Sequence, residues 1–222
     1  MGMFPLSLEW SRCPDGIEIV DRGETVETNF FGEKISARPR EWLRGRTDRR
    51  APVLLESIDL ENPLALQYVN TKTPEARIAF MERYGFLDEG IVGADGIEEW
   101  PVEWVEDRHE GLCHALTKSF GKSVAEKSTD LNNLLQSAPL KTSVEFAGDG
   151  KGRMVFHPKS LLHLMCLEVT TAAINDVDLA RCANCNAAFF TGRMAHRRID
   201  AKFCSDRCRV AAMRKRNAAK ED

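Results

Sequence analysis

Residues 182–208 read CANCNAAFFTGRMAHRRIDAKFCSDRC and contain two closely spaced cysteine pairs, Cys182/Cys185 and Cys204/Cys208. Two residues between the first two cysteines allow a tight turn whose sulfurs converge on one point, as a tetrahedral zinc ion requires. Four thiolates fill the coordination of one structural Zn²⁺ and leave no open position for catalysis. The spacing therefore predicts a Zn(Cys)4 site at Cys182, Cys185, Cys204 and Cys208.

The residues around the cysteines predict a treble-clef or zinc-ribbon module. Between the pairs, a short hairpin is expected, with residues 188–190 on one strand and Phe203 at the end of the other. Ser205 is a good N-cap for a following helix, and Asp206 suits the positive end of its dipole. Because so short a module buries little apolar surface, we expect the metal to supply much of its stability and its phenylalanines to form a small core.

Two disulfides, or four ordinary thiols, are the alternative interpretation of these cysteines. The N-terminus has no basic start, no sustained apolar run and no obvious cleavage site, so we expect a cytoplasmic protein in a reducing compartment. Clustered cysteines there indicate a metal more often than a disulfide. Cys13 and Cys113 are isolated, and Cys166 lies in an apolar run that predicts a buried core thiol.

Length and charge predict two parts, a body over residues 1–175 and a small module over residues 176–222. The chain has 222 residues and is 43% hydrophobic, which fits one ordinary domain with an appendage. From residue 181 onward there are eleven Lys/Arg and four Asp/Glu, a net charge of +7, and the remainder carries 20 against 30, a net charge of −10. No apolar run approaches the roughly 20 residues that cross a bilayer, so no membrane segment is expected.

The body is predicted to be a helix-rich mixed domain of the α+β class. Residues 73–84 have a threonine N-cap, proline at the first helical position and apolar residues at helical spacing. Strands are expected at 6–10, 17–20, 141–146 and 153–156, helices at 100–120, 124–136 and 157–175, a loop or solvated helix at 38–50, a turn at 90–96 and a polar linker at 175–178. This order lacks the alternation of strand and helix that builds a parallel sheet.

The basic residues of the module predict a phosphate-binding surface. At 100° per residue, the final helix has small residues, with Cys208, on the metal side and cations around the outside. A helix and loop with this many guanidiniums would contact nucleic-acid phosphates, most simply those of DNA, without reading sequence. The candidate contacts are Arg193, Arg197, Arg198, Arg207, Arg209, Arg214, Lys215, Arg216 and Lys220.

Three other interpretations of this charge remain open. Some cations would simply offset the negative charge of a four-thiolate zinc site. The basic tail would also suit a protein partner, the acidic body of its own chain or self-association. A charged C-terminus is often only a solvated end.

The order of these elements resembles the CGNR zinc-finger proteins with an ABATE-like N-terminal domain. The resemblance is strongest over residues 158–216, where a Pro-Lys-Ser-Leu-Leu helix precedes the four cysteines and Arg197-Arg198 precede Phe203-Cys204-Ser205. Leu64-Ala-Leu-Gln-Tyr-Val-Asn70 is a weaker match in the body. The sequence departs from the family where it is named, because its last cysteine opens Cys208-Arg-Val-Ala211 and not Cys-Gly-Asn-Arg. The resemblance implies a stress-related transcription regulator.

Motifs typical of enzymes fail on geometry, so no catalytic residue or activity is predicted. His109 and His114 are five residues apart, about 140° around a helix, whereas a metalloprotease motif needs four. Gly121-Lys-Ser123 lacks the earlier glycine of a phosphate-binding loop, since that position is Leu116. The acidic run from Glu98 to Asp107 is expected to be a solvated helix face.

Overall fold

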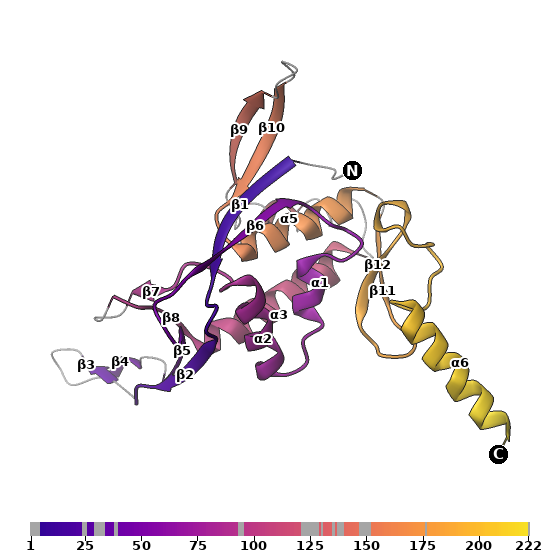
Figure 1. The fold of residues 1–222 in the computed structure, drawn as a ribbon, viewed down its shortest axis with the longest axis horizontal. Coiled ribbons are helices and arrows are strands. Elements are labelled where there is room, and N and C mark those ends of the chain that lie inside the picture. Colours follow the sequence, from indigo (N-terminus) through magenta and orange to yellow (C-terminus); the bar gives the residue numbers. More distant parts are fainter. Residues whose placement is uncertain are drawn as a thin grey trace.

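The computed structural model describes residues 5–23, 26–28, 34–37, 40–92, 96–120, 129, 131–134, 136, 140–146, 152–175 and 177–221. These residues form a mixed body of helices and sheets. A β-hairpin made of residues 140–146 and 152–158 projects from the body, and so does the C-terminal helix α6 (Asp206–Glu221) (Figure 1). Within the described residues, no helix is both long enough and apolar enough to cross a membrane.

The first sheet has the strand order β6-β1-β10-β9. Its strands are β1 (Pro5–Arg12), β6 (Ala51–Ser57), β9 (Leu140–Phe146) and β10 (Gly152–Pro158). β1 runs parallel to β10, and the other pairs are antiparallel. The predicted N-terminal strand and the predicted β9–β10 hairpin are thus confirmed, and the hairpin loop lies outside the described residues.

The second sheet corrects two predictions. Its order is β2-β5-β8-β7, with β2 (Ile17–Asp21), β5 (Glu41–Gly45), β7 (Ile91–Val92) and β8 (Glu98–Pro101). The loop or helix expected at 38–50 is wrong for residues 41–45, because Trp42 and Leu43 are buried in β5, whereas residues 46–50 form a loop. Glu99, expected on a solvated helix, lies in β8 at 3% exposure and pairs with Arg22.

In the sequence between β2 and β5, β3 (Val26–Thr28) and β4 (Lys34–Ala37) form a separate antiparallel pair of strands. The turn predicted at 90–96 is only partly described. Its first residues form β7, which pairs with β8, and residues 93–95 lie outside the described ranges.

The helices of the body with described bounds are α1 (Leu64–Val69), α2 (Pro74–Tyr84), α3 (Val102–Ser119) and α5 (Leu161–Ile174). The α2 prediction is confirmed, and the Thr73 side chain accepts a hydrogen bond from the Ala76 N–H. Most of the helix predicted at 124–136 lies outside the described residues. α5 begins later than predicted, because β10 continues to Pro158 and Ser160 caps the helix.

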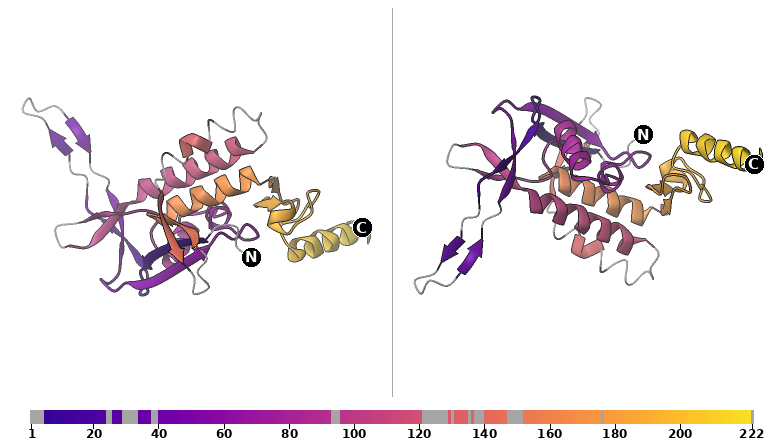
Figure 2. Two further views of the ribbon diagram at one scale, coloured as in Figure 1. Left: turned by 90° about the horizontal axis from the view of Figure 1, so that it is seen from above. Right: turned by 90° about the horizontal axis from the view of Figure 1, so that it is seen from below.

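The core lies among these helices and extends to both four-stranded sheets, with α5 against the first sheet and α3 against the second. Nine of the fourteen residues of α5 are buried, and Figure 2 shows this helix beside α3. Cys166 is buried there, as predicted. Glu168, at 3% exposure, accepts hydrogen bonds from the N–H groups of Leu64 and Ala65 and so caps α1 from a neighbouring helix. Burial raises the pKa of Glu168 to about 8, although these two donors oppose the shift.

The C-terminal region opens with two short paired strands. β11 (Asp178–Arg181) pairs antiparallel with β12 (Ala188–Thr191), followed by the short 3-10 helix η1 (Arg193–Ala195) and α6. The polar linker predicted at 175–178 is wrong for its last two residues, because Val177 is buried and Asp178 is the first residue of β11. The predicted strand at 201–203 is also wrong, since the partner of β12 is β11.

Candidate metal centre and basic surface

The turn between β11 and β12 positions the first cysteine pair. Cys182 follows β11 directly, and its N–H donates to the Ala187 carbonyl at 2.9 Å. The Asn186 N–H returns a hydrogen bond to the Cys182 carbonyl at 2.9 Å. Asn186 has φ 61°, a left-handed conformation that asparagine tolerates better than most residues. The chain therefore turns tightly enough to aim Cys182 and Cys185 at one point.

The start of α6 positions the second pair. The Ser205 hydroxyl accepts from the Cys208 N–H at 3.3 Å, which confirms the predicted cap, and Asp206 lies in the first turn. Cys204 therefore precedes the helix and Cys208 lies within its first turn. The Ala183 N–H donates to the Lys202 carbonyl at 2.9 Å and ties the two cysteine-bearing segments together.

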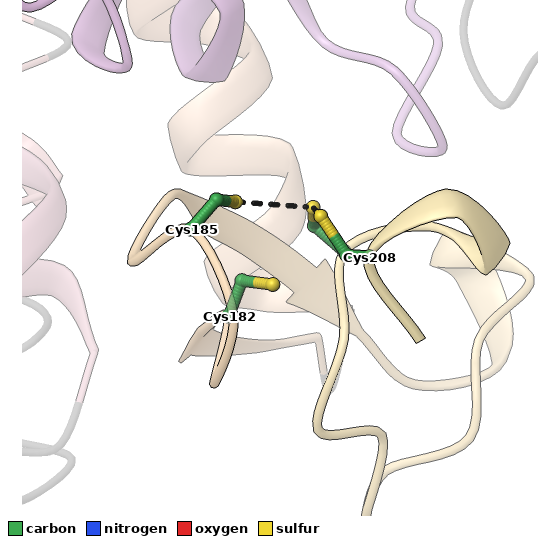
Figure 3. Close-up of side chains that lie close together, drawn as sticks. Cys182, Cys185 and Cys208 are labelled. Carbon is green, nitrogen blue, oxygen red and sulfur yellow. Dashed lines mark hydrogen bonds between the residues drawn. The ribbon is translucent and has the colours of Figure 1, made fainter. Parts of the chain in front are cut away.

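The four sulfurs form a compact cluster with the dimensions of a tetrahedral metal site. All four lie within 4.8 Å of one another, and Figure 3 shows the side chains of Cys182, Cys185 and Cys208 directed into one space. The sulfur of Cys204 is 3.6 Å from those of both Cys185 and Cys208. A zinc tetrahedron with bonds of about 2.3 Å has sulfur-to-sulfur edges of about 3.8 Å. The cluster can therefore hold one metal ion, and its donor set suits zinc.

The thiols of the cluster differ in their pKa values. Burial opposes ionisation of Cys182, but the backbone N–H groups of Cys204, Cys185 and Asn184 outweigh it and lower its pKa to about 6. Burial, followed by hydrogen bonds with the neighbouring cysteines, raises the pKa of Cys204 to about 12. Hydrogen bonds, first of all with Asn184, lower the pKa of Cys208. A bound divalent cation would deprotonate the remaining ligands.

The cysteine cluster is attached to the body by β12. Asn70, at the end of α1, donates its amide to the Ala188 carbonyl at 2.8 Å and accepts from the Ala188 N–H at 2.7 Å. Phe190 is fully buried in the body core, with its ring centroid 5.4 Å from that of Phe120. The prediction that the phenylalanines form a separate small core is therefore wrong for Phe190. Sequence reasoning missed this attachment, which nothing local in β12 reveals.

The predicted phosphate contacts divide into two groups. Arg198 pairs with Asp200, Arg209 pairs with Asp206, and the Arg197 guanidinium lies over the Phe189 ring at 5.6 Å. A second group is exposed and has no ion pair with any described residue: Arg193, Arg207, Arg214, Lys215 and Arg216. The side chain of Lys220 lies outside the described part. Most of the predicted phosphate contacts that have no ion pair with a described residue therefore lie in α6.

α6 presents these cations away from the body. Cys208, Ala211 and Ala212 are the half-buried residues of the helix, and the other described side chains from 206 to 219 are exposed. Both views in Figure 2 show α6 extending outward from the C-terminal region. The small residues therefore face the metal centre, as predicted.

An open cavity of about 600 Å³ lies at the base of α6. Its lining includes Arg197, Lys202 and Arg209, together with Asp206 and Glu61 of the body. Because both acidic and basic side chains line the cavity, its walls carry mixed charge. Glu61 was not among the residues that the sequence singled out.

His109 and His114 lie in different surroundings on α3. His109 is held by Arg77, at 3.3 Å from its Nδ1, and by the Val69 carbonyl, at 3.2 Å from its Nε2, while His114 is exposed. Burial, followed by the nearby Arg77 charge, lowers the pKa of His109. In the described ranges, the four cysteines are the group of potential metal ligands that comes together.

Comparisons with known proteins add no family assignment. No protein-family model matches the chain, and no curated protein matches it.

Proposed function

We propose that the four cysteines bind one structural Zn²⁺ in a treble-clef-type module, and that the cations around it bind nucleic acid, as in a transcription regulator. The observation that carries this proposal is the combination of a four-sulfur cluster and a projecting helix with exposed cations that have no ion pair with any described residue. The metal would orient the helix, and the helix would contact phosphates.

The zinc part rests on sulfur geometry and on local chain direction. A turn of the C-x-x-C type faces the first turn of a helix, and the shortest distances between the two segments approach those of a thiolate tetrahedron. The resemblance to CGNR zinc-finger proteins is part of the same proposal. It includes Leu64–Asn70, which corresponds to α1 and ends at the asparagine that contacts β12.

The nucleic-acid part rests on the distribution of charge. Arg214, Lys215 and Arg216 are consecutive, exposed and without an acidic partner among the described residues, so phosphate contacts would cost little internal pairing. Backbone phosphates are the expected targets, since nothing identifies a residue for base readout.

A second candidate is an interaction protein whose zinc module contacts protein. The contact of β12 with the body favours a structural role for the module within its own chain. The basic helix takes no part in that contact, and its residues from 213 to 219 are exposed. The same helix would then recognise an acidic protein surface.

Titration of the zinc-loaded full chain with labelled duplex DNA at several salt concentrations tests the proposal. The variant Arg214→Gln/Lys215→Gln/Arg216→Gln should bind more weakly. Its log K against log salt slope should fall by up to about 2.7, or about 0.9 per lost phosphate contact. The matched control, Arg46→Gln/Lys118→Gln/Lys159→Gln, changes the net charge equally on the body and should leave the slope unchanged. Single-stranded RNA in parallel separates DNA from RNA.

Absence of binding at low salt would overturn nucleic-acid recognition, and so would equal losses in the two triple variants. Zinc content is measured on the same samples. A chain that holds zinc without binding nucleic acid would favour the protein-contact function.

A further inference from the structure

The β9–β10 hairpin exposes a continuous apolar face. The exposed fractions are 62% for Val144, 74% for Phe146 and 55% for Met154. Val144 lies directly opposite Met154, and Phe146 lies opposite Gly152, against which its ring packs. Exposed apolar side chains gathered on one face of a strand pair typically mark an interaction surface.

β9 is also an open edge. In the described part of the chain it pairs with β10 alone, so one side of its backbone has no strand partner. The opposite edge, β6, contains Pro52, which removes a backbone donor and discourages further pairing. β9 contains neither proline nor glycine over Leu140–Phe146. Of the two edges of this sheet, β9 is therefore the better template for another strand.

The sequence of β9 is complementary to itself in one antiparallel register. A two-fold axis perpendicular to the sheet and midway between the Ser143 residues of two copies would place Lys141 opposite Glu145 of the second copy, and Glu145 opposite its Lys141. On the other face, Leu140 would meet Phe146, and Thr142 would meet Val144. Opposite charges and apolar pairs across antiparallel strands are each stabilising.

The partners within one hairpin extend this complementarity. Glu145 already accepts from Arg153 on β10 at 2.9 Å, so a second copy would continue a row of alternating charge from Arg153 through Glu145 to Lys141. On the apolar face, Met154 and Val144 would continue to Thr142 of the second copy. Registers centred on Thr142 or Val144 do not bring Lys141 opposite Glu145.

We infer that β9 is a dimerisation edge, at which two copies of this chain join antiparallel about Ser143 and merge their four-stranded sheets into one. The hairpin projects from the body, as Figure 1 shows, so that the two bodies would lie toward opposite ends of the joined strands. A two-fold interface of this kind uses the same patch on both copies.

Sedimentation analysis of the zinc-loaded full chain over the micromolar range tests this inference. The wild type should dimerise. Lys141→Glu places two pairs of like charges across the interface, so its dimer dissociation constant should rise on the order of tenfold or more. Lys159→Glu makes the same charge change beyond the end of β10 and should dimerise like the wild type.

A charge swap makes the register itself testable. Glu145→Lys/Arg153→Glu reverses the charge at the edge while keeping an opposite-charge pair inside the hairpin, and this variant alone should be monomeric. Mixed with Lys141→Glu, it should form a heterodimer, because each Glu then faces a Lys. Circular dichroism checks that each variant is folded.

A monomeric wild type throughout this range would overturn the inference and leave the edge to a strand of a different protein. Dimers that ignore both charge reversals would overturn it as well, since they would form elsewhere on the surface.

Discussion

The body and the C-terminal region are held together by different means. In the body, α5 is buried along most of its length, and an extended core surrounds it. In the C-terminal region, α6 is exposed along nearly all of its length, and its half-buried residues face the cysteine cluster. Apolar burial alone therefore explains the order of the body but not the orientation of α6. Two kinds of attachment remain for the C-terminal region: the metal centre and the contact of β12 with the body.

Loss of a metal ligand should give the largest effect and separate the two regions. We expect Cys204→Ser to lose stoichiometric zinc, because a site with three thiolates and one hydroxyl binds zinc much more weakly than a site with four thiolates. Structural zinc contributes on the order of 10 kcal/mol to small modules. Hydrogen exchange should accelerate at residues 182–212 and stay slow in α5. Cys113→Ser, a cysteine outside the cluster, is the matched control. Equal zinc content in the two variants would contradict the proposed site.

Removal of the Phe190 ring should give the next largest effect. Although Phe190 belongs to β12, its side chain lies in the body core, so Phe190→Ala should destabilise the body by about 3–5 kcal/mol. Denaturant unfolding monitored by circular dichroism measures the change. Phe203→Ala, at a half-buried position between the cysteine pairs, should cost less. A larger loss from Phe203→Ala would mean that the C-terminal region has its own core after all.

The Asn70 contact should give the smallest effect of the three. Asn70→Ala removes both hydrogen bonds to the Ala188 backbone, and it should lower the free energy of unfolding by about 1–3 kcal/mol. Amide exchange at residues 178–191 should accelerate while zinc remains bound. Asn62→Ala, at an exposed position, is the control. If exchange in β12 is unchanged, the attachment to the body depends on Phe190 alone.

The features that the sequence predicts well are local. The cap of α2 depends on Thr73 and Pro74, and the start of α6 depends on Ser205, all within one turn of the helices they affect. The cysteine cluster is also predictable, because two short spacings restrict where four sulfurs can lie. The β9–β10 hairpin is predictable because its two strand segments, 141–146 and 153–156, flank a glycine-rich stretch of sequence.

The features that the sequence conceals depend on distant neighbours. Basic residues around Trp42 and Leu43 suggest a solvated segment, yet pairing with β2 and β8 makes it a buried strand. β11 is short and polar at both ends, and only β12 identifies it as a strand. Glu168 interrupts an apolar run in the sequence, but its role as a cap depends on α1, about one hundred residues earlier.

X-ray absorption at the zinc edge, on the full chain with its metal content measured, tests most directly whether Cys182, Cys185, Cys204 and Cys208 together bind one zinc ion. We expect one zinc per chain and a first shell of four sulfurs at about 2.3 Å. Nitrogen or oxygen atoms in that shell, or a folded chain that takes up no stoichiometric zinc, would contradict this expectation.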